Sequence, residues 1–105
     1  MTSPRFETDL VRGGLERSGW DETSEAVILT SGFVYGSAAE AEAAFAGEDD
    51  RYIYSRYGNP TVSMFQERLR LVEGAEACYA TASGMAAVFT SLIAILEQGG
   101  RVVAS

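Results

Sequence analysis

Residues 77–105 read ACYATASGMAAVFTSLIAILEQGGRVVAS, and this stretch decides the class of fold. Its first five residues predict a short buried strand, its middle a helix capped by Ser83, and its last five residues a second strand. Two strands joined through a helix form a parallel crossover unit, which needs more strands beside it and cover on both faces. We therefore predict the start of an α/β domain and expect the chain to be a truncated piece of a larger protein.

The predicted helix after Ser83 is apolar on nearly every side, and we expect Gly99-Gly100 to end it. One face is formed by five residues at helical spacing: Met85, Val88, Phe89, Leu92 and Leu96. Residues 93–95, Ile-Ala-Ile, fill the other sides. A helix of this kind is normally buried on more than one side, which again calls for neighbouring elements.

Two further helices are predicted upstream from their end signals. Asn59 is a good N-cap, Pro60 suits the first helical position and Gly74 ends the helix. Ser37 and Glu40 form a capping box, in which each side chain can satisfy a backbone N–H at the start of a helix that ends before residue 47. Residues 1–25 are polar and glycine-interrupted, and they predict an extended arm with one short helical turn.

Composition excludes several classes of function. The 105 residues carry a net charge of −7 and contain no histidine, and all eight basic residues are arginine. An acidic surface disfavours nucleic acid and anionic membranes as partners. The single cysteine, Cys78, allows neither an intrachain disulfide nor a zinc cluster, so it is interpreted as a small core residue. The start of the chain lacks the pattern of a signal peptide, and we expect a cytoplasmic protein.

One candidate phosphate site is the turn before the helix, at Ser83, Gly84 and Met85. The first turn of a helix has free backbone N–H groups and a partial positive charge, so it binds anions. Gly84 has no Cβ to keep a phosphate away, and the Ser83 hydroxyl is a further donor. The alternative is that Ser83 only caps the helix and Gly84 only packs.

A second candidate is Tyr54 with Arg56, within RYIYSRYGNPT at residues 51–61. In an extended chain these two side chains point the same way, together with Tyr52, while Tyr57 points to the other face. A guanidinium binds phosphate through two N–H groups, and a phenol adds another donor. The alternative is that the tyrosines pack locally and the arginines pair with acidic residues 48–50.

The segments YSRYGNPTVSMFQERLRLVEG (54–74) and ATASGMAAVFTSL (80–92) together resemble the pyridoxal-phosphate enzymes of cysteine and methionine metabolism. The upstream run VRGGLERSGWDETSEAVILTSGFVYGSAAEAEAAFAGE (11–48) is most similar to the sulfhydrylases of this family that act on O-succinylhomoserine. The resemblance implies the aspartate-aminotransferase (fold type I) architecture, with residues 1–58 as an arm and subunit-contact segment. Residues 59–105 would then start the large cofactor-binding α/β domain.

The same resemblance implies pyridoxal 5′-phosphate as cofactor. Ser83, Gly84 and Met85 match the family's phosphate cradle, and Tyr54 and Arg56 match a pair that reaches the same phosphate from a neighbouring subunit. It implies a homo-oligomer, dimer or tetramer, with shared active sites and small-molecule substrates. The reaction would be γ-replacement, in which sulfide displaces succinate from O-succinylhomoserine to give homocysteine, a step of methionine biosynthesis.

The chain departs from the family in what it lacks. The family's cofactor-binding lysine and its catalytic residues match positions beyond residue 105, and this chain has no lysine, so we expect it to be inactive alone. The alternatives are a non-catalytic oligomerisation or phosphate-binding module, or a related member: a cystathionine γ-synthase or γ-lyase, or an O-acetylhomoserine sulfhydrylase.

Overall fold

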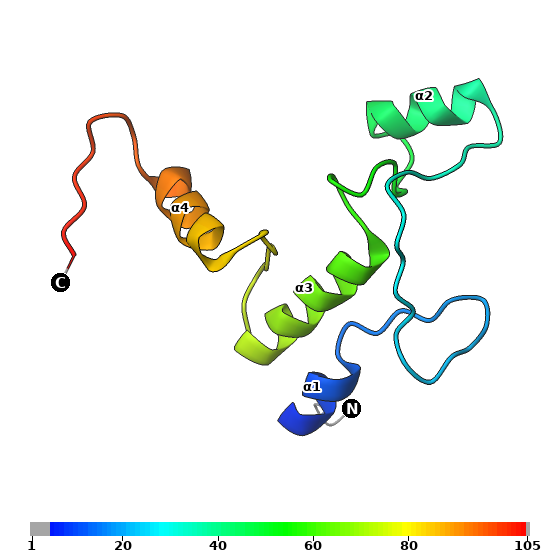
Figure 1. Ribbon diagram of the computed structural model, residues 1–105, viewed down its shortest axis with the longest axis horizontal. Coiled ribbons are helices and arrows are strands. Elements are labelled where there is room, and N and C mark those ends of the chain that lie inside the picture. The colour runs from blue at the N-terminus through cyan, green and yellow to red at the C-terminus, as the bar shows by residue number, and fades with distance from the viewer. Residues whose placement is uncertain (1–4, 105) are drawn as a thin grey trace.

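The computed structural model describes residues 5–104 as four helices joined by long connections (Figure 1). In chain order the helices are α1 (Phe6–Arg12), α2 (Ala38–Ala46), α3 (Pro60–Glu73) and α4 (Gly84–Ile95). The predicted short turn in the arm is the seven-residue helix α1. The other three helices lie where the sequence predicts them.

The predicted N-caps are confirmed at three helices. Ser37 accepts from the N–H of Glu40, Asn59 from Thr61 and Ser83 from Ala86. In the capping box, the Glu40 carboxylate accepts from the N–H of Gly36 at 2.8 Å, one residue earlier than the reciprocal box requires.

The predicted helix ends are confirmed for α2 and α3 but not for α4. Gly47 and Gly74 end their helices with φ of 76° and 62°, in the left-handed region that glycine adopts without strain. The last helix ends at Ile95, four residues before Gly99, so the prediction of its C-terminus was wrong. The helical spacing of apolar residues continues through Leu96. This spacing indicates which residues share a face, but it does not fix where the helix ends, and the helical backbone ends before the glycines.

The two predicted strands are not paired in this chain. Within residues 5–104 the sole β-bridge joins Gly32 to Tyr54, and neither 77–81 nor 101–104 belongs to a ladder. Figure 1 shows these two segments on either side of α4. A strand is held by hydrogen bonds to a neighbour, and two isolated strands are at best marginal without a third or a covering layer. The order strand segment, helix, strand segment is present, but no sheet forms within residues 5–104.

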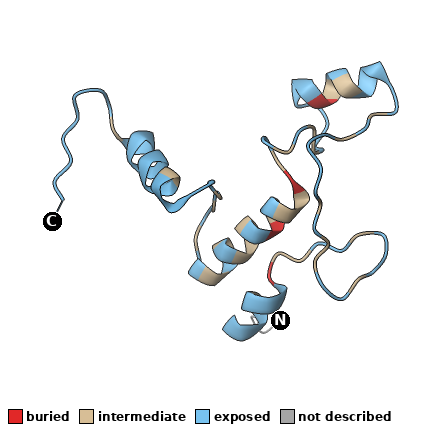
Figure 2. Cartoon of the chain, viewed as in Figure 1, coloured by how far each residue is buried: buried red, intermediate tan, exposed pale blue. Residues whose placement is uncertain are grey.

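The chain is far more open than a closed domain. Its radius of gyration is 17.6 Å, against about 13 Å for a compact domain of 100 residues. Among the described residues, Ala44 and Met64 are the only buried hydrophobic side chains, each 5% exposed. No residue of α4 is buried, and Figure 2 shows most of this helix in the pale blue of exposed residues. The apolar sides of α4 are therefore uncovered by the described residues.

The arm is nevertheless fastened to α3. Of the helix pairs, only α1 and α3 pack together. The Arg68 side chain on α3 donates from Nε to the Gly13 carbonyl at 3.0 Å and forms an ion pair with Glu25. Met64 lies at the centre of this contact, where its sulfur accepts from the N–H of Glu16. Residues 13–25 are thus held against one face of α3.

Candidate functional site

The first turn of α4 presents free donors. Ser83 has extended backbone angles, with φ −160° and ψ 160°, and its hydroxyl oxygen accepts from Ala86 N at 3.1 Å. The hydrogen bonds of the described residues include none donated by the N–H of Gly84 or Met85. Both groups belong to the orphan donors of a helix start, in a helix of 12 residues. The Ser83 hydroxyl hydrogen also remains available, so three donors lie on consecutive residues.

This donor set fits an anion such as a phosphate. Backbone N–H groups at a helix N-terminus attract negative charge through their partial positive charge. A Cβ placed on Gly84 would meet no atom of the chain within 4 Å. Packing inside the chain therefore does not require glycine at this position, and the space is open to a ligand.

Tyr54 and Arg56 come together through a turn, not through an extended chain. The N–H groups of Tyr57 and Gly58 both donate to the Tyr54 carbonyl, at 2.9 and 3.2 Å. The Arg56 guanidinium carbon lies 5.4 Å from the Tyr54 ring centre and 5.6 Å from that of Tyr57. Those two rings meet edge to face at 6.1 Å. The guanidinium is thus held between two aromatic rings, a favourable cation–π arrangement.

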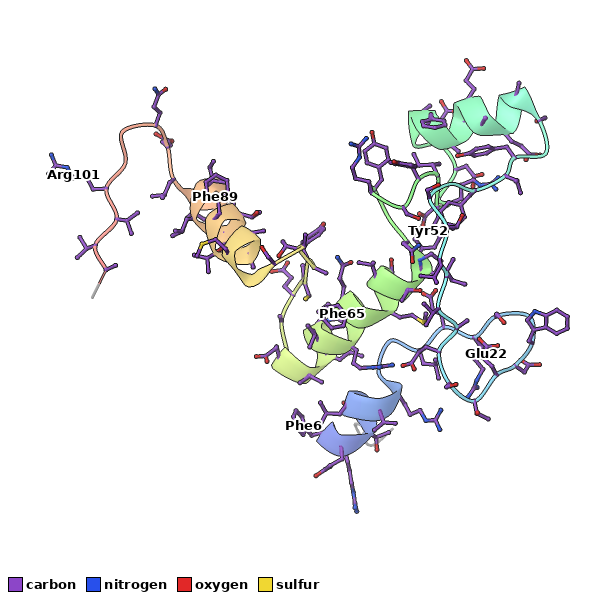
Figure 3. All side chains as sticks on the ribbon, in the orientation of Figure 1. Phe6, Glu22, Tyr52, Phe65, Phe89 and Arg101 are labelled. Carbon is purple, nitrogen blue, oxygen red and sulfur yellow. The ribbon has the colours of Figure 1, made fainter. Side chains whose placement is uncertain are left out.

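The turn corrects the predicted faces of this segment. Tyr57 was assigned to the face opposite Tyr54, yet it joins Tyr54 around Arg56. The ring of Tyr52, predicted to share the Tyr54 face, stacks on Phe33 at 5.6 Å, between α2 and the start of α3 (Figure 3). The i, i+2 rule holds only while the chain is extended, and the turn at residues 54–57 brings i and i+3 together instead.

The two arginines of the stretch have different surroundings. Arg51 pairs with Asp49 at 3.9 Å and with Glu40 at 3.8 Å, and it donates to the Val34 carbonyl at 2.8 Å. Arg51 therefore fits the alternative interpretation, in which the arginines of this stretch pair with acidic residues of the chain. Arg56 is exposed, and none of the ion pairs or side-chain hydrogen bonds within residues 5–104 includes it. Its five N–H donors face solvent, which suits binding of an anion from outside the chain.

The two candidate sites are not brought together in this single chain. Tyr54 and Arg56 precede α3, whereas Ser83, Gly84 and Met85 follow it, and no hydrogen bond or aromatic contact among the described residues joins the two groups. A ligand bound by both groups would need a second copy of the chain or a different arrangement of the connections.

Sequence reasoning missed two residues of the turn. Asn59 was assigned only an N-cap role, but it is the buried polar residue of the described chain, 6% exposed, and also donates to Ile28 and Ser55. Tyr57 was placed on the wrong face. The Gly58-Asn59-Pro60 run is a turn signal, and it could have indicated that the preceding residues are not extended.

Other features of the chain lie apart from these residues. Cys78 is half-buried and free. Trp20, in the arm, is 90% exposed. Glu22 and Glu67 have a pKa below the ordinary value, because Ser18 donates to the first and Arg70 to the second. No helix within residues 5–104 is long and apolar enough to cross a bilayer.

Comparison with solved structures identifies the class of fold. A crystal structure of a protein described as an O-acetylhomoserine (thiol)-lyase from Campylobacter jejuni, with N′-pyridoxyl-lysine-5′-monophosphate, superposes with a TM-score of 0.78 at 31% identity, over 87% of this chain and 22% of that one. Apo CalE6, a methionine γ-lyase from Micromonospora echinospora, gives a TM-score of 0.70 at 26% identity, over 92% of this chain and 23% of that one. The chain has the fold of part of a type I pyridoxal-phosphate enzyme.

Sequence comparison then gives the family. The model for Cys/Met metabolism PLP-dependent enzymes matches residues 7–105, and the chain belongs to that family. An O-succinylhomoserine sulfhydrylase from Mycobacterium tuberculosis is 72% identical over 90% of this chain, and one from Pseudomonas aeruginosa is 45% identical over 95%. The chain spans 23% and 25% of the lengths of these relatives. The family and its cofactor, pyridoxal phosphate, confirm the expectations from sequence.

Proposed function

We propose that Ser83, Gly84 and Met85 bind the phosphate of pyridoxal phosphate, and that Tyr54 and Arg56 bind the phosphate held by a neighbouring copy of the chain. The observation that carries the proposal is the pair of N–H groups at Gly84 and Met85, which have no acceptor among the described residues. The exposed Arg56 between two rings supports the second half. The Tyr54–Arg56 pair and residues 83–85 do not meet within one chain. A phosphate site formed between two copies of the chain would therefore use the pair from one copy and residues 83–85 from the other.

The proposal assigns a role to each half of the chain. Residues 1–58 serve as the arm and subunit-contact segment, and residues 59–105 begin the large cofactor-binding domain. The arm is fastened to its own α3 through Arg68, so it leaves the domain from a fixed point. Its exposed apolar side chains, among them Trp20 and Leu29 at 90% and 92%, are then free to cover a second subunit.

For the whole protein we propose O-succinylhomoserine sulfhydrylase activity in a cytoplasmic homo-oligomer. Sulfide displaces succinate from O-succinylhomoserine, and the products are homocysteine and succinate. The bound cofactor supplies the electron sink for this chemistry. The residues of this chain hold its phosphate, and thereby fix where its ring lies. The 72% identity to the Mycobacterium tuberculosis sulfhydrylase supports this member of the family, against 36% for an O-acetyl-L-homoserine sulfhydrylase from Thermus thermophilus.

One observation separates an enzyme from a non-catalytic module. We expect the coding sequence after codon 105 to continue in frame and to encode a lysine-bearing segment. The encoded protein should then form homocysteine from O-succinylhomoserine and sulfide, and do so faster than from O-acetylhomoserine. A stop codon at that position, or a preference for the acetyl ester, would contradict the proposed activity.

The shared phosphate site is tested by subunit mixing. We use a full-length chimera, in which residues 1–105 of this chain replace the segment that they match in the Mycobacterium tuberculosis relative. Arg56→Ala removes a charge-assisted contact, and Gly84→Val places a side chain where the phosphate must approach. Each variant alone should bind pyridoxal phosphate weakly and be nearly inactive.

Equal amounts of the two variants are then unfolded together and reassembled. In a two-fold dimer half of the dimers are mixed, and each mixed dimer contains one site with an intact cradle and an intact Arg56, so about a quarter of all sites should recover. The control is each variant reassembled alone. No recovery, with mixed dimers confirmed by mass, would show that Arg56 and Gly84 do not serve one phosphate from different chains.

A further inference from the structure

The most buried polar side chain described in this protein lies next to the Tyr54–Arg56 turn. Asn59 is 6% exposed and makes three hydrogen bonds. Its oxygen caps α3 by accepting from Thr61 N at 2.9 Å. Its amide nitrogen donates to the Ile28 carbonyl and to the Ser55 hydroxyl oxygen, both at 3.1 Å. Capping needs only the oxygen, so the two bonds from the nitrogen require a separate explanation.

Ser55 is the residue between Tyr54 and Arg56, and it is fixed from two sides. Its N–H donates to the Ser31 carbonyl at 2.9 Å, and its hydroxyl donates to the Thr30 carbonyl. The hydroxyl oxygen in turn accepts from Asn59. Backbone and side chain of Ser55 are therefore both tied to residues 30–31, and Asn59 completes the connection.

The same region is closed by further bonds between distant parts of the chain. Gly32 and Tyr54 form the β-bridge, and Ile28 N donates to the Thr61 hydroxyl at 2.8 Å. Residues 28–32, the turn at 54–58 and the start of α3 thus form one hydrogen-bonded unit, called here the polar seam. Asn59 is the one member whose side chain bonds to all three parts.

Arg56 depends on this seam for its direction. Its guanidinium lies over the rings of Tyr54 and Tyr57, and no hydrogen bond or ion pair of the described residues includes it. The two rings lie around the guanidinium only because the turn at residues 54–58 brings them together, so the position of Arg56 depends on that turn. If Ser55 were released, the flanking residues 54 and 56 would lose a common orientation, and binding an anion through both would cost conformational entropy.

We propose that Asn59 is a positioning residue for phosphate binding, which acts through Ser55 to orient Tyr54 and Arg56. This inference rests on the function proposed for that pair. It predicts that the amide nitrogen of Asn59, beyond its capping oxygen, contributes to the affinity for the phosphate group of the cofactor.

Asn59→Asp separates the two roles, because the carboxylate still caps α3 but cannot donate to Ile28 or Ser55. Ser55→Ala breaks the same connection from the other end and leaves the cap intact. Ser37→Ala is the matched control, since it removes the N-cap of α2, which is not part of the seam. Arg56→Ala is the reference for loss of the phosphate contact itself.

The measurements are the dissociation constants of the apo chimera for pyridoxal phosphate and for pyridoxal, which lacks the phosphate, taken well below the melting temperature of each variant. We expect Asn59→Asp and Ser55→Ala to weaken pyridoxal phosphate binding by about tenfold, the equivalent of one charge-assisted hydrogen bond. Pyridoxal binding should change by less than about twofold, since that contact is absent. Added to the double change Tyr54→Phe with Arg56→Ala, either change should weaken binding no further, because both groups that Asn59 orients are then absent.

Four results would overturn the inference. Equal weakening of both ligands, or a lowered melting temperature with unchanged affinities as expected for Ser37→Ala, would assign Asn59 a structural role only. The same conclusion follows if neither variant folds. If Arg56→Ala weakens the binding of pyridoxal phosphate and of pyridoxal equally, the function proposed for Tyr54 and Arg56 is wrong. The role proposed for Asn59 is then wrong as well, because it depends on that function.

Discussion

Arg68 is predicted to hold the arm against α3, and its loss should expose the arm to protease. Its side chain, 25% exposed, donates from Nε to the Gly13 carbonyl at 3.0 Å and pairs with Glu25, which is 32% exposed. Arg68→Met keeps the length of the stem and removes both contacts. A hydrogen bond from a charged donor contributes about 1.5 kcal/mol, and a half-exposed ion pair about 0.5 kcal/mol. The expected loss is therefore about 2 kcal/mol for docking of the arm.

This free energy translates into a cleavage rate. When opening of the arm is fast relative to proteolysis, the rate follows the open population, and 2 kcal/mol raises that population about 30-fold. Trypsin cuts after arginine, and residues 1–25 contain Arg5, Arg12 and Arg17, of which the last two lie nearest to Gly13, the residue that Arg68 contacts. We expect cleavage at these two sites in the chimera to become about 30-fold faster in Arg68→Met, followed by mass spectrometry of the released peptides.

Arg70→Met is the matched control. Arg70 lies two residues further along the same helix, but its carboxylate partner Glu67 is also on α3, at 2.7 Å, so it holds nothing of the arm. Its loss should leave cleavage at Arg12 and Arg17 unchanged. A double-mutant cycle with Glu25→Gln should give a coupling energy of about 0.5 kcal/mol for the ion pair. Equal cleavage rates in Arg68→Met and Arg70→Met would refute the role assigned to Arg68.

Three further predictions follow from the described contacts. Met64→Ala should destabilise the chimera by about 2–3 kcal/mol in urea unfolding, because the side chain is 5% exposed at the contact between arm and α3; a change below about 0.5 kcal/mol would be typical of a surface position and would contradict this. Hydrogen bonds from Ser18 lower the pKa of Glu22 below its ordinary value of 4.5. Ionised Glu22 therefore contributes to folding stability above pH 4.5, and this contribution is lost as the pH falls through the lowered pKa of the folded state. Glu22→Gln should remove this part of the acid sensitivity, and a stability profile that is unchanged across this pH range would show that the hydrogen bonds do not persist in solution. The 105-residue chain has no lysine, so with its α-amino group blocked it should form no stoichiometric covalent adduct with pyridoxal phosphate after borohydride reduction, and mass spectrometry showing one would disprove the expectation.

The sequence by itself determined the helices and the family. The caps at Ser37, Asn59 and Ser83 and the glycine ends at 47 and 74 are confirmed because each depends on atoms within a few residues of the chain. The two candidate phosphate motifs, at residues 54–56 and 83–85, are likewise short. Interactions between residues so close in the chain can be predicted from the local sequence, because they depend little on the rest of the fold.

Only the tertiary structure decided what these local pieces contact. Asn59 donates a hydrogen bond to Ile28, 31 residues away in the sequence, and Arg68 donates one to Gly13, 55 residues away. No periodic pattern in the sequence predicts either hydrogen bond. The position of α2 also decides which arginine has a carboxylate partner. Arg51 pairs with Glu40 on α2, whereas Arg56 has no carboxylate partner among the described residues. The segments 77–81 and 101–104 also show the effect of tertiary contacts: a strand is stabilised by neighbouring strands, and none pairs with either segment within residues 5–104.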